Sequence, residues 1–190
     1  MKINEIFYSI QGEGFHAGEA AVFIRFAGCN LSCPFCDTNH HPFKEMTEDE
    51  ICAEVEKYPS RLVVITGGEP TLQLTASLVG KLHRLHREVA IETNGTREIP
   101  NGVDWVTVSP KDDFVANGKP VIKRADEVKI VFDGTNIPTK DICALHYYIQ
   151  PCDTGDAERN KEILAQCVEF VKNNPSWKLS LQQQKILNVR

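Results

Sequence analysis

Short apolar runs recur along the whole chain, and most of them end in Gly, Pro, Asn or Asp. This pattern constrains the fold more than any other feature, because such runs are typical of buried β-strands. We assign strands to residues 21–27, 62–66, 89–93, 105–109, 128–132 and 147–150, with a last run at 178–181.

Three helical patterns lie between these runs. Thr47 and Glu50 have the spacing of a capping box, which marks the start of a helix. A second helix is predicted over 74–86, where leucines repeat with the spacing of one helical face, and a third over 157–172. Strands that alternate with helices indicate βα units and a mainly parallel sheet.

The segment between the third and fourth runs cannot hold a good crossover helix. Only eleven residues separate Thr93 from Trp105, and they include Asn94–Gly95, Pro100 and Asn101–Gly102. We therefore predict an α/β fold: an open, partial TIM-like barrel (β6/α3-type) of mainly parallel strands with reduced helices. A length of 190 residues fits one domain spanning 1–190.

Composition excludes several classes of protein. Hydrophobic residues make up 42% and charged residues 25% of the chain, which is ordinary for a soluble globular protein. The net charge is −5 with scattered Lys and Arg, so no nucleic-acid surface is indicated. No run approaches the roughly 18 apolar residues that span a bilayer, and the polar N-terminus is unlike a signal peptide. We expect a cytoplasmic protein that does not bind membranes.

Three of the seven cysteines are clustered, with the spacing C-x3-C-x2-C at Cys29, Cys33 and Cys36. An odd number of cysteines argues against a complete set of disulfides, and clustered thiols are typical of metal ligands. Three thiolates on one loop can bind three irons of a cubane cluster. The fourth iron would then be open to chelation by the amino and carboxylate groups of S-adenosylmethionine (SAM). Cys52 and Cys167 stand alone, and we expect both to be small buried hydrophobes.

Zinc is an alternative for the same loop. His40 follows the three cysteines, so Cys29, Cys33, Cys36 and His40 have the composition of a Cys3His site. The spacing alone leaves both metal centres open.

Polar residues follow four of the predicted strands. The carboxyl ends of parallel strands meet at one mouth of a barrel, so we expect these groups to converge there. They are Thr66-Gly67-Gly68-Glu69-Pro70, Glu92-Thr93-Asn94-Gly95, Ser109-Pro110-Lys111 and Gln150-Pro151-Cys152-Asp153.

The motifs CNLSCPFC and GGEP together resemble the radical SAM superfamily. Within it, the chain is similar to the 7-carboxy-7-deazaguanine synthase family over most of its length, including Gln150-Pro151 and the closing residues 179–185. The most specific segments of this resemblance are Ser9-Ile10-Gln11-Gly12-Glu13-Gly14, Cys36-Asp37-Thr38 and Ser109-Pro110-Lys111.

The resemblance implies an activity and a set of cofactors. Members of that family convert 6-carboxy-5,6,7,8-tetrahydropterin to 7-carboxy-7-deazaguanine with loss of ammonia, a carbon–nitrogen lyase step toward queuosine. The cofactors implied are a [4Fe–4S] cluster, SAM and Mg²⁺. The partners implied are a second copy of the chain and an electron donor such as flavodoxin or ferredoxin.

The resemblance also assigns residues. The cluster falls on the three clustered cysteines and Mg²⁺ on Thr38. By the resemblance, the residues that bind the pterin are Ile10, Gln11, Gly12, Glu13, Arg25 and Thr66. Those that bind SAM are Phe35, Cys36, Asp37, Gly68, Ser109, Pro110, Lys111 and Gln150. Arg25 has independent support, because a charge inside an apolar run needs a partner and a guanidinium can grip a carboxylate by two hydrogen bonds. Glu13 can accept from the guanidine-like edge of a pterin.

Two other functions remain open from the sequence. One is an activase that installs a glycyl radical on a partner protein, which would stay within the superfamily. The other is a zinc-binding structural or nucleic-acid module. The SIQGEG segment and the Cys36-Asp37-Thr38 ending favour a small-molecule substrate over the activase.

Overall fold

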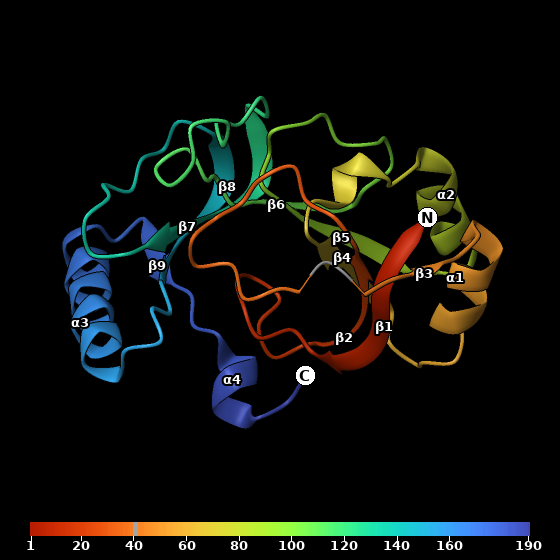
Figure 1. Cartoon of the computed structure of the whole chain (residues 1–190), viewed down its shortest axis with the longest axis horizontal. Helices are drawn as coiled ribbons and strands as arrows, with labels where there is room; N and C mark the ends of the chain where they lie inside the picture. The colour runs from red at the N-terminus through yellow and green to blue at the C-terminus, as the bar shows by residue number, and fades with distance from the viewer. Residues whose placement is uncertain (40–41) are drawn as a thin grey trace.

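The computed structural model describes residues 1–39 and 42–190 and contains one curved, nine-stranded sheet in the order β3-β1-β2-β4-β5-β6-β7-β8-β9 (Figure 1). Six central strands run parallel and confirm the predicted open, partial barrel. They are β2 (Ala20–Phe26), β4 (Leu62–Gly67), β5 (Glu88–Thr93), β6 (Trp105–Val108), β7 (Arg124–Phe132) and β8 (Cys143–Pro151).

The first strand, β1 (Lys2–Ile10), was not predicted. It pairs antiparallel with β2, carries a bulge between Ile3 and Glu5, and is flanked by the two-residue β3 (Lys44–Glu45). Its polar residues obscure the strand pattern, because one face of β1 is turned to the cavity described below instead of to a core. The last strand, β9 (Trp177–Leu179), pairs parallel with β8. It begins one residue before the run expected at 178–181.

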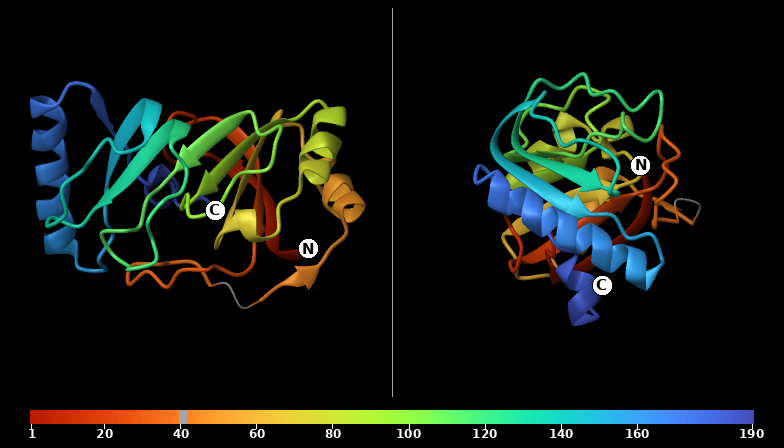
Figure 2. Two further views of the ribbon diagram at one scale, coloured as in Figure 1. Left: turned by 90° about the horizontal axis from the view of Figure 1, so that it is seen from above. Right: turned by 90° about the vertical axis from the view of Figure 1, so that its left-hand side faces the viewer.

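All three predicted helices are present. They are α1 (Glu48–Val55), α2 (Ala76–Arg84) and α3 (Ala157–Asn173), and the structure adds a 3₁₀ turn η1 (Pro70–Leu72) and a short α4 (Gln183–Leu187). Thr47 and Glu50 form the predicted capping box. Residues 94–104, all of which the structure describes, contain no helix, as expected. Helices α1 and α2 lie together at one end of the sheet and α3 lies at the other (Figure 2).

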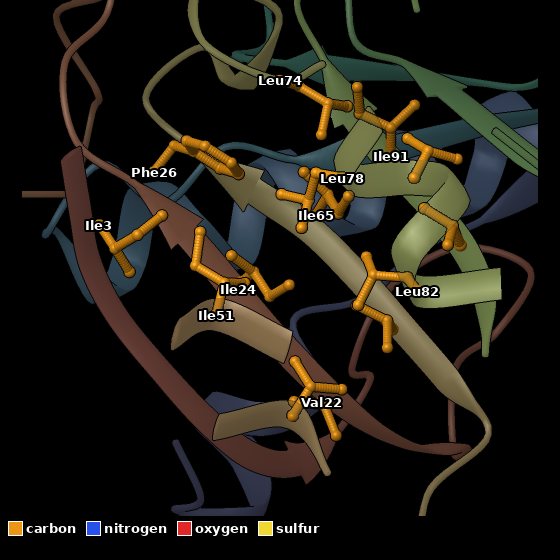
Figure 3. Packing of buried hydrophobic residues seen from close by; sticks show 14 residues of the cluster. Ile3, Val22, Ile24, Phe26, Ile51, Ile65, Leu74, Leu78, Leu82 and Ile91 are labelled. Carbon is orange, nitrogen blue, oxygen red and sulfur yellow. The ribbon is translucent and has the colours of Figure 1, made fainter. Parts of the chain in front are cut away.

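The outer face of the sheet is covered by these helices. Ile51 of α1 and Leu78 and Leu82 of α2 are fully buried against strands β2, β4 and β5 (Figure 3). Burial of each such side chain contributes about 1.5–3 kcal/mol. A second core lies under α3, where Cys167 is fully buried as expected, and Cys52 is half-buried against the first core.

The inner face changes character along the strands. Phe23, Val64 and Ala90 form an apolar layer. Residues two positions further on share that face, because side chains alternate across a strand. These are Arg25, Thr66 and Glu92, and all three line a cavity at the carboxyl ends of the strands.

Within the described ranges, no helix has the length and apolar character needed to cross a membrane.

Candidate active site

A cavity of about 1140 Å³ opens at the carboxyl ends of the parallel strands. Every residue assigned to a site from the sequence lines it except Pro110, which lies between the lining residues Ser109 and Lys111. The lining set comprises Ile10, Gln11, Gly12, Glu13, Arg25, Cys29, Cys33, Phe35, Cys36, Asp37, Thr38, Thr66, Gly68, Ser109, Lys111 and Gln150. The predicted convergence of strand ends is thereby borne out.

The three clustered cysteines lie on the loop that leaves β2, and that loop is pressed against the glycine pair after β4. Glu69 N donates to Gly28 O at 3.0 Å, and Gly28 has a φ of +88°. A Cβ on Gly68 would lie 2.1 Å from the carbonyl oxygen of Gly28 and 2.9 Å from Cβ of Cys29. Glycine at position 68 is therefore required for the loop to sit where it does.

The three thiols fit a thiolate-bound metal cluster by chemistry and by position. All three line one wall of the cavity. Burial raises the pKa of Cys29 and of Cys33. Glu69 and Cys36 raise that of Cys29 further, and Cys29 and Cys36 raise that of Cys33 further. A bound cation would reverse that shift, since metal ligation deprotonates a thiol. Among the described residues, no group of three Cys, His, Asp or Glu side chains is arranged to hold a single metal ion. The alternative zinc ligand His40 lies outside the described residues.

Glu69 of the GGEP motif has a structural role that the sequence did not reveal. Its buried carboxylate accepts from the hydroxyl of Thr71 at 2.6 Å and of Thr93 at 2.7 Å, and from the backbone N–H of Asn94 at 2.8 Å. The carboxylate therefore ties the loop after β4 to the loop after β5. Its full burial is consistent with this number of partners.

The segment after β1 forms the floor of the cavity. Gln11 Nε2 donates to Glu92 Oε1 at 2.9 Å, and the backbone N–H of Phe15 donates to Glu127 Oε2 at 2.8 Å. Glu13 forms an ion pair with Lys129. Although burial favours the neutral acid, Lys129 and two glutamine amides hold the pKa of Glu13 at about 2. Glu13 is thus a carboxylate at neutral pH.

The sequence placed Glu92 among the polar residues expected at the cavity but assigned it no ligand, and it missed Lys129 altogether. Both line the cavity, and Lys129 lies within the buried strand β7, where only 6% of its side chain is exposed. The available signal was a charge inside the apolar run Val128-Lys129-Ile130-Val131, the same signal that singled out Arg25.

Arg25 faces the cavity from an interior strand. Its Nε donates to Glu5 Oε1 at 2.9 Å, and the two residues are register partners across β1 and β2. Its guanidinium carbon lies 5.9 Å from the centre of the Phe7 ring. About a quarter of the side chain, 24%, remains exposed. Because β2 lies between two other strands and the Arg25 side chain lines the cavity, Arg25 is not an outward-facing surface charge.

The residues expected near SAM, apart from Pro110, also line the cavity. Lys111 Nζ donates to the carbonyl and hydroxyl oxygens of Ser109, both at 2.6 Å, and burial lowers the pKa of Lys111 to about 8. Gln150 Oε1 accepts from Ser180 Oγ at 2.8 Å. The ring of Phe35 packs edge-on against Phe114 with 4.6 Å between centroids.

The C-terminal segment completes the wall between β1 and β9. Lys185 of α4 lies 2.7 Å from Asp153 and 3.5 Å from Asp37 of the cysteine loop. A Cβ on Gly12 would lie 1.8 Å from Gln184 Oε1, so glycine at position 12 permits the close approach of α4. This contribution could not be predicted, because α4 has no buried residue that would mark it in the sequence.

Comparisons with known proteins agree with this geometry. Residues 23–133 match the model of the radical SAM superfamily. Over 190 residues the chain is 49% identical to a 7-carboxy-7-deazaguanine synthase of Bacteroides thetaiotaomicron, covering 100% of this chain and 98% of that one. The chain belongs to the 7-carboxy-7-deazaguanine synthase family of radical SAM enzymes.

Other members of the family are similar over nearly the whole chain. A 7-carboxy-7-deazaguanine synthase of Caulobacter vibrioides is 38% identical, covering 98% of both chains. The crystal structure of QueE from Escherichia coli superposes with a TM-score of 0.77 at 28% identity, covering 95% of this chain and 93% of that one. Membership of the radical SAM superfamily implies a [4Fe–4S] cluster and SAM as cofactors.

Proposed function

We propose that this chain converts 6-carboxy-5,6,7,8-tetrahydropterin to 7-carboxy-7-deazaguanine with release of ammonia, as a radical SAM lyase of queuosine biosynthesis. The observation that carries the proposal is the composition of one cavity. A three-cysteine loop, a glycine-lined rim and an inner layer of Arg25, Thr66 and Glu92 all face it, in a chain 49% identical to a synthase of that name.

Cys29, Cys33 and Cys36 would hold the cluster. When bound together, the cluster and SAM supply a 5′-deoxyadenosyl radical. The contribution of the protein is to position both reactants and to exclude water. Gln11 and Glu13 join the segment after β1 to Glu92 of β5 and to Lys129 of β7, which supports that role.

SAM would lie along the wall that holds the cysteine loop. The backbone at Gly68 can approach its methionine part closely, because no Cβ intervenes. Ser109, Pro110 and Lys111 would flank the ribose and Gln150 the adenine. Phe35, Cys36 and Asp37 would complete the contacts beside the cluster.

The pterin would lie against the inner layer. Arg25 is the candidate for its carboxylate, since a guanidinium offers two parallel donors. Ile10, Gln11, Gly12 and Thr66 would surround the ring. The resemblance assigns Glu13 to the donor edge of the ring, but Glu92 has more free acceptor sites facing the cavity.

Mg²⁺ is proposed at Thr38, which lines the cavity two residues beyond the last clustered cysteine. A hydroxyl is a sufficient ligand only for a hard cation that keeps other oxygen ligands, as Mg²⁺ does. The substrate carboxylate would share the metal. Thr38→Ala should weaken the response of turnover to added Mg²⁺ with an intact cluster, and an unchanged Mg²⁺ titration would contradict the assignment.

The cellular setting follows from the thiol chemistry. Three clustered thiols suit a reducing cytoplasm. We propose that the enzyme works there as a homodimer, with an electron donor such as flavodoxin or ferredoxin.

Anaerobic reconstitution followed by incubation with the pterin, SAM and a reductant tests the function. We expect a brown protein with a broad band near about 400 nm, together with 7-carboxy-7-deazaguanine and 5′-deoxyadenosine. Cys33→Ala should lose both colour and turnover, whereas Cys52→Ala, a matched cysteine outside the cavity, should keep them. A colourless zinc protein, or 5′-deoxyadenosine without the deazaguanine, would contradict the proposal.

A further inference from the structure

Lys129 is a buried cation surrounded by carboxylates. Its Nζ contacts Glu13 Oε2 and lies 3.8 Å from Glu92 Oε1, while Glu127 lies two residues earlier on the same face of β7. Its neighbours Val128 and Ile130 are buried on the other face. A lysine in such a strand persists only if its charge is compensated.

The two carboxylates that contact or approach Lys129 differ in how many acceptor sites they have left. Glu13 Oε1 accepts from Gln182 at 3.1 Å and from Gln184 at 3.0 Å, and Oε2 faces Lys129, with 13% of the side chain exposed. A carboxylate has about four acceptor sites, so Glu13 is nearly saturated by the protein itself.

Glu92 is the more open of the two. Its Oε1 accepts from Gln11, and its Oε2 lies 3.4 Å from the hydroxyl of Thr66, which is a long contact. Its side chain is 29% exposed, and that exposure is to the cavity. The acceptor capacity that remains for a bound molecule therefore belongs to Glu92.

The ammonium of Lys129 contacts Glu13 and attracts Glu92 Oε1 at 3.8 Å, and this attraction fixes where the Glu92 carboxylate lies. A compact ammonium with three donors can serve both carboxylates at once.

We propose that Lys129 is a positioning residue whose ammonium, anchored on Glu13, holds Glu92 in place as a carboxylate that accepts from paired N–H donors on the substrate. This inference rests on the proposed function, because a 2-amino-4-oxopyrimidine ring presents that donor edge. It adds a specificity: the site prefers a 2-amino ring to the same ring with a 2-oxo group.

The test measures binding of two ligands to the reconstituted enzyme by equilibrium dialysis. One is the carboxytetrahydropterin, and the other is its analogue with oxygen in place of the 2-amino group. We expect Lys129→Met to reduce the preference for the amino compound by about 10- to 100-fold, the value of hydrogen bonds to a charged group. SAM affinity should stay within about twofold of wild type, a change of about 0.4 kcal/mol, and Lys129→Arg should restore part of the preference.

Controls separate this role from a purely structural one. Lys81→Met removes a lysine that is also paired with two carboxylates, Glu48 and Asp49, but outside the cavity, and should leave the preference unchanged. The double variant Lys129→Met/Glu13→Gln avoids a buried unpaired Glu13 and should still lack the preference. Equal loss for both compounds, or a preference restored in the double variant, would overturn the inference. A wild-type enzyme that binds neither compound would refute the proposed function instead.

Discussion

Gly68 is the point at which the cysteine loop and the segment after β4 touch. Because a Cβ there would lie 2.1 Å from the carbonyl oxygen of Gly28, Gly68→Ala must displace one of the two backbones. We expect less iron per chain after reconstitution and weaker SAM binding. Iron analysis and dialysis against SAM measure both.

Gly80→Ala in α2 is the matched control. Its Cβ would meet nothing closer than Arg84 at 3.8 Å, and alanine should stabilise the helix by about 0.5–1 kcal/mol. If both variants take up iron and SAM as the wild type does, the close approach at Gly68 has no functional consequence.

Arg25 holds Glu5 through Nε and keeps part of its side chain in the cavity. Arg25→Ala should raise the substrate KM by about 30- to 150-fold, equivalent to about 2–3 kcal/mol for a charge-assisted bidentate contact. SAM binding should change little, and Arg84→Ala on the exposed surface of α2 should change neither. Equal damage to both ligands would make Arg25 a structural residue.

At the scale of elements, periodicity located the parallel strands and the three helices, because each of these is buried on a face that leaves an apolar pattern. It missed β1 and α4 for one shared reason. β1 presents polar residues to the cavity, and α4 is held by polar contacts such as Lys185 with Asp153. Lys129 was missed, and Glu92 was given no role, because the residues that pair with them are distant in sequence. Sequence periodicity reveals elements that have a buried face, but it does not reveal which side chains pair across the fold.

The loops after β4 and β5 depend on one carboxylate, Glu69. Glu69→Ala would leave the hydroxyls of Thr71 and Thr93 and the N–H of Asn94 without their acceptor in a buried site. A loss of at least about 2–3 kcal/mol in unfolding free energy should follow. Urea denaturation of the apoprotein measures it, with Glu69→Gln, which keeps one acceptor oxygen, expected to lose less. An unchanged midpoint for Glu69→Ala would refute the linkage.

At the scale of the whole molecule, three distant parts of the chain meet at Glu13: the segment after β1, strand β7 through Lys129, and the C-terminal segment through Gln182 and Gln184. The pKa of Glu13 is lowered from 4.5 to about 2. The folded state therefore binds this proton less readily than the unfolded chain. The stabilisation from Glu13 is complete above pH 4.5 and is lost as the pH falls toward 2.

Acid titration of the apoprotein tests this closure. The difference in unfolding free energy between wild type and Glu13→Gln should be constant near neutrality and should shrink between pH 4.5 and 2. A difference that does not change with pH would show that Glu13 contributes no charge-dependent contact between these parts.

In the proposed reaction, one cavity brings a C–H bond of the pterin to the 5′ carbon of SAM. The most direct measurement is anaerobic turnover of the substrate deuterated at its saturated ring carbons, with mass spectrometry of both products. We expect 7-carboxy-7-deazaguanine together with 5′-deoxyadenosine that carries deuterium. Unlabelled 5′-deoxyadenosine, or labelled 5′-deoxyadenosine with no deazaguanine formed, would rule out this reaction.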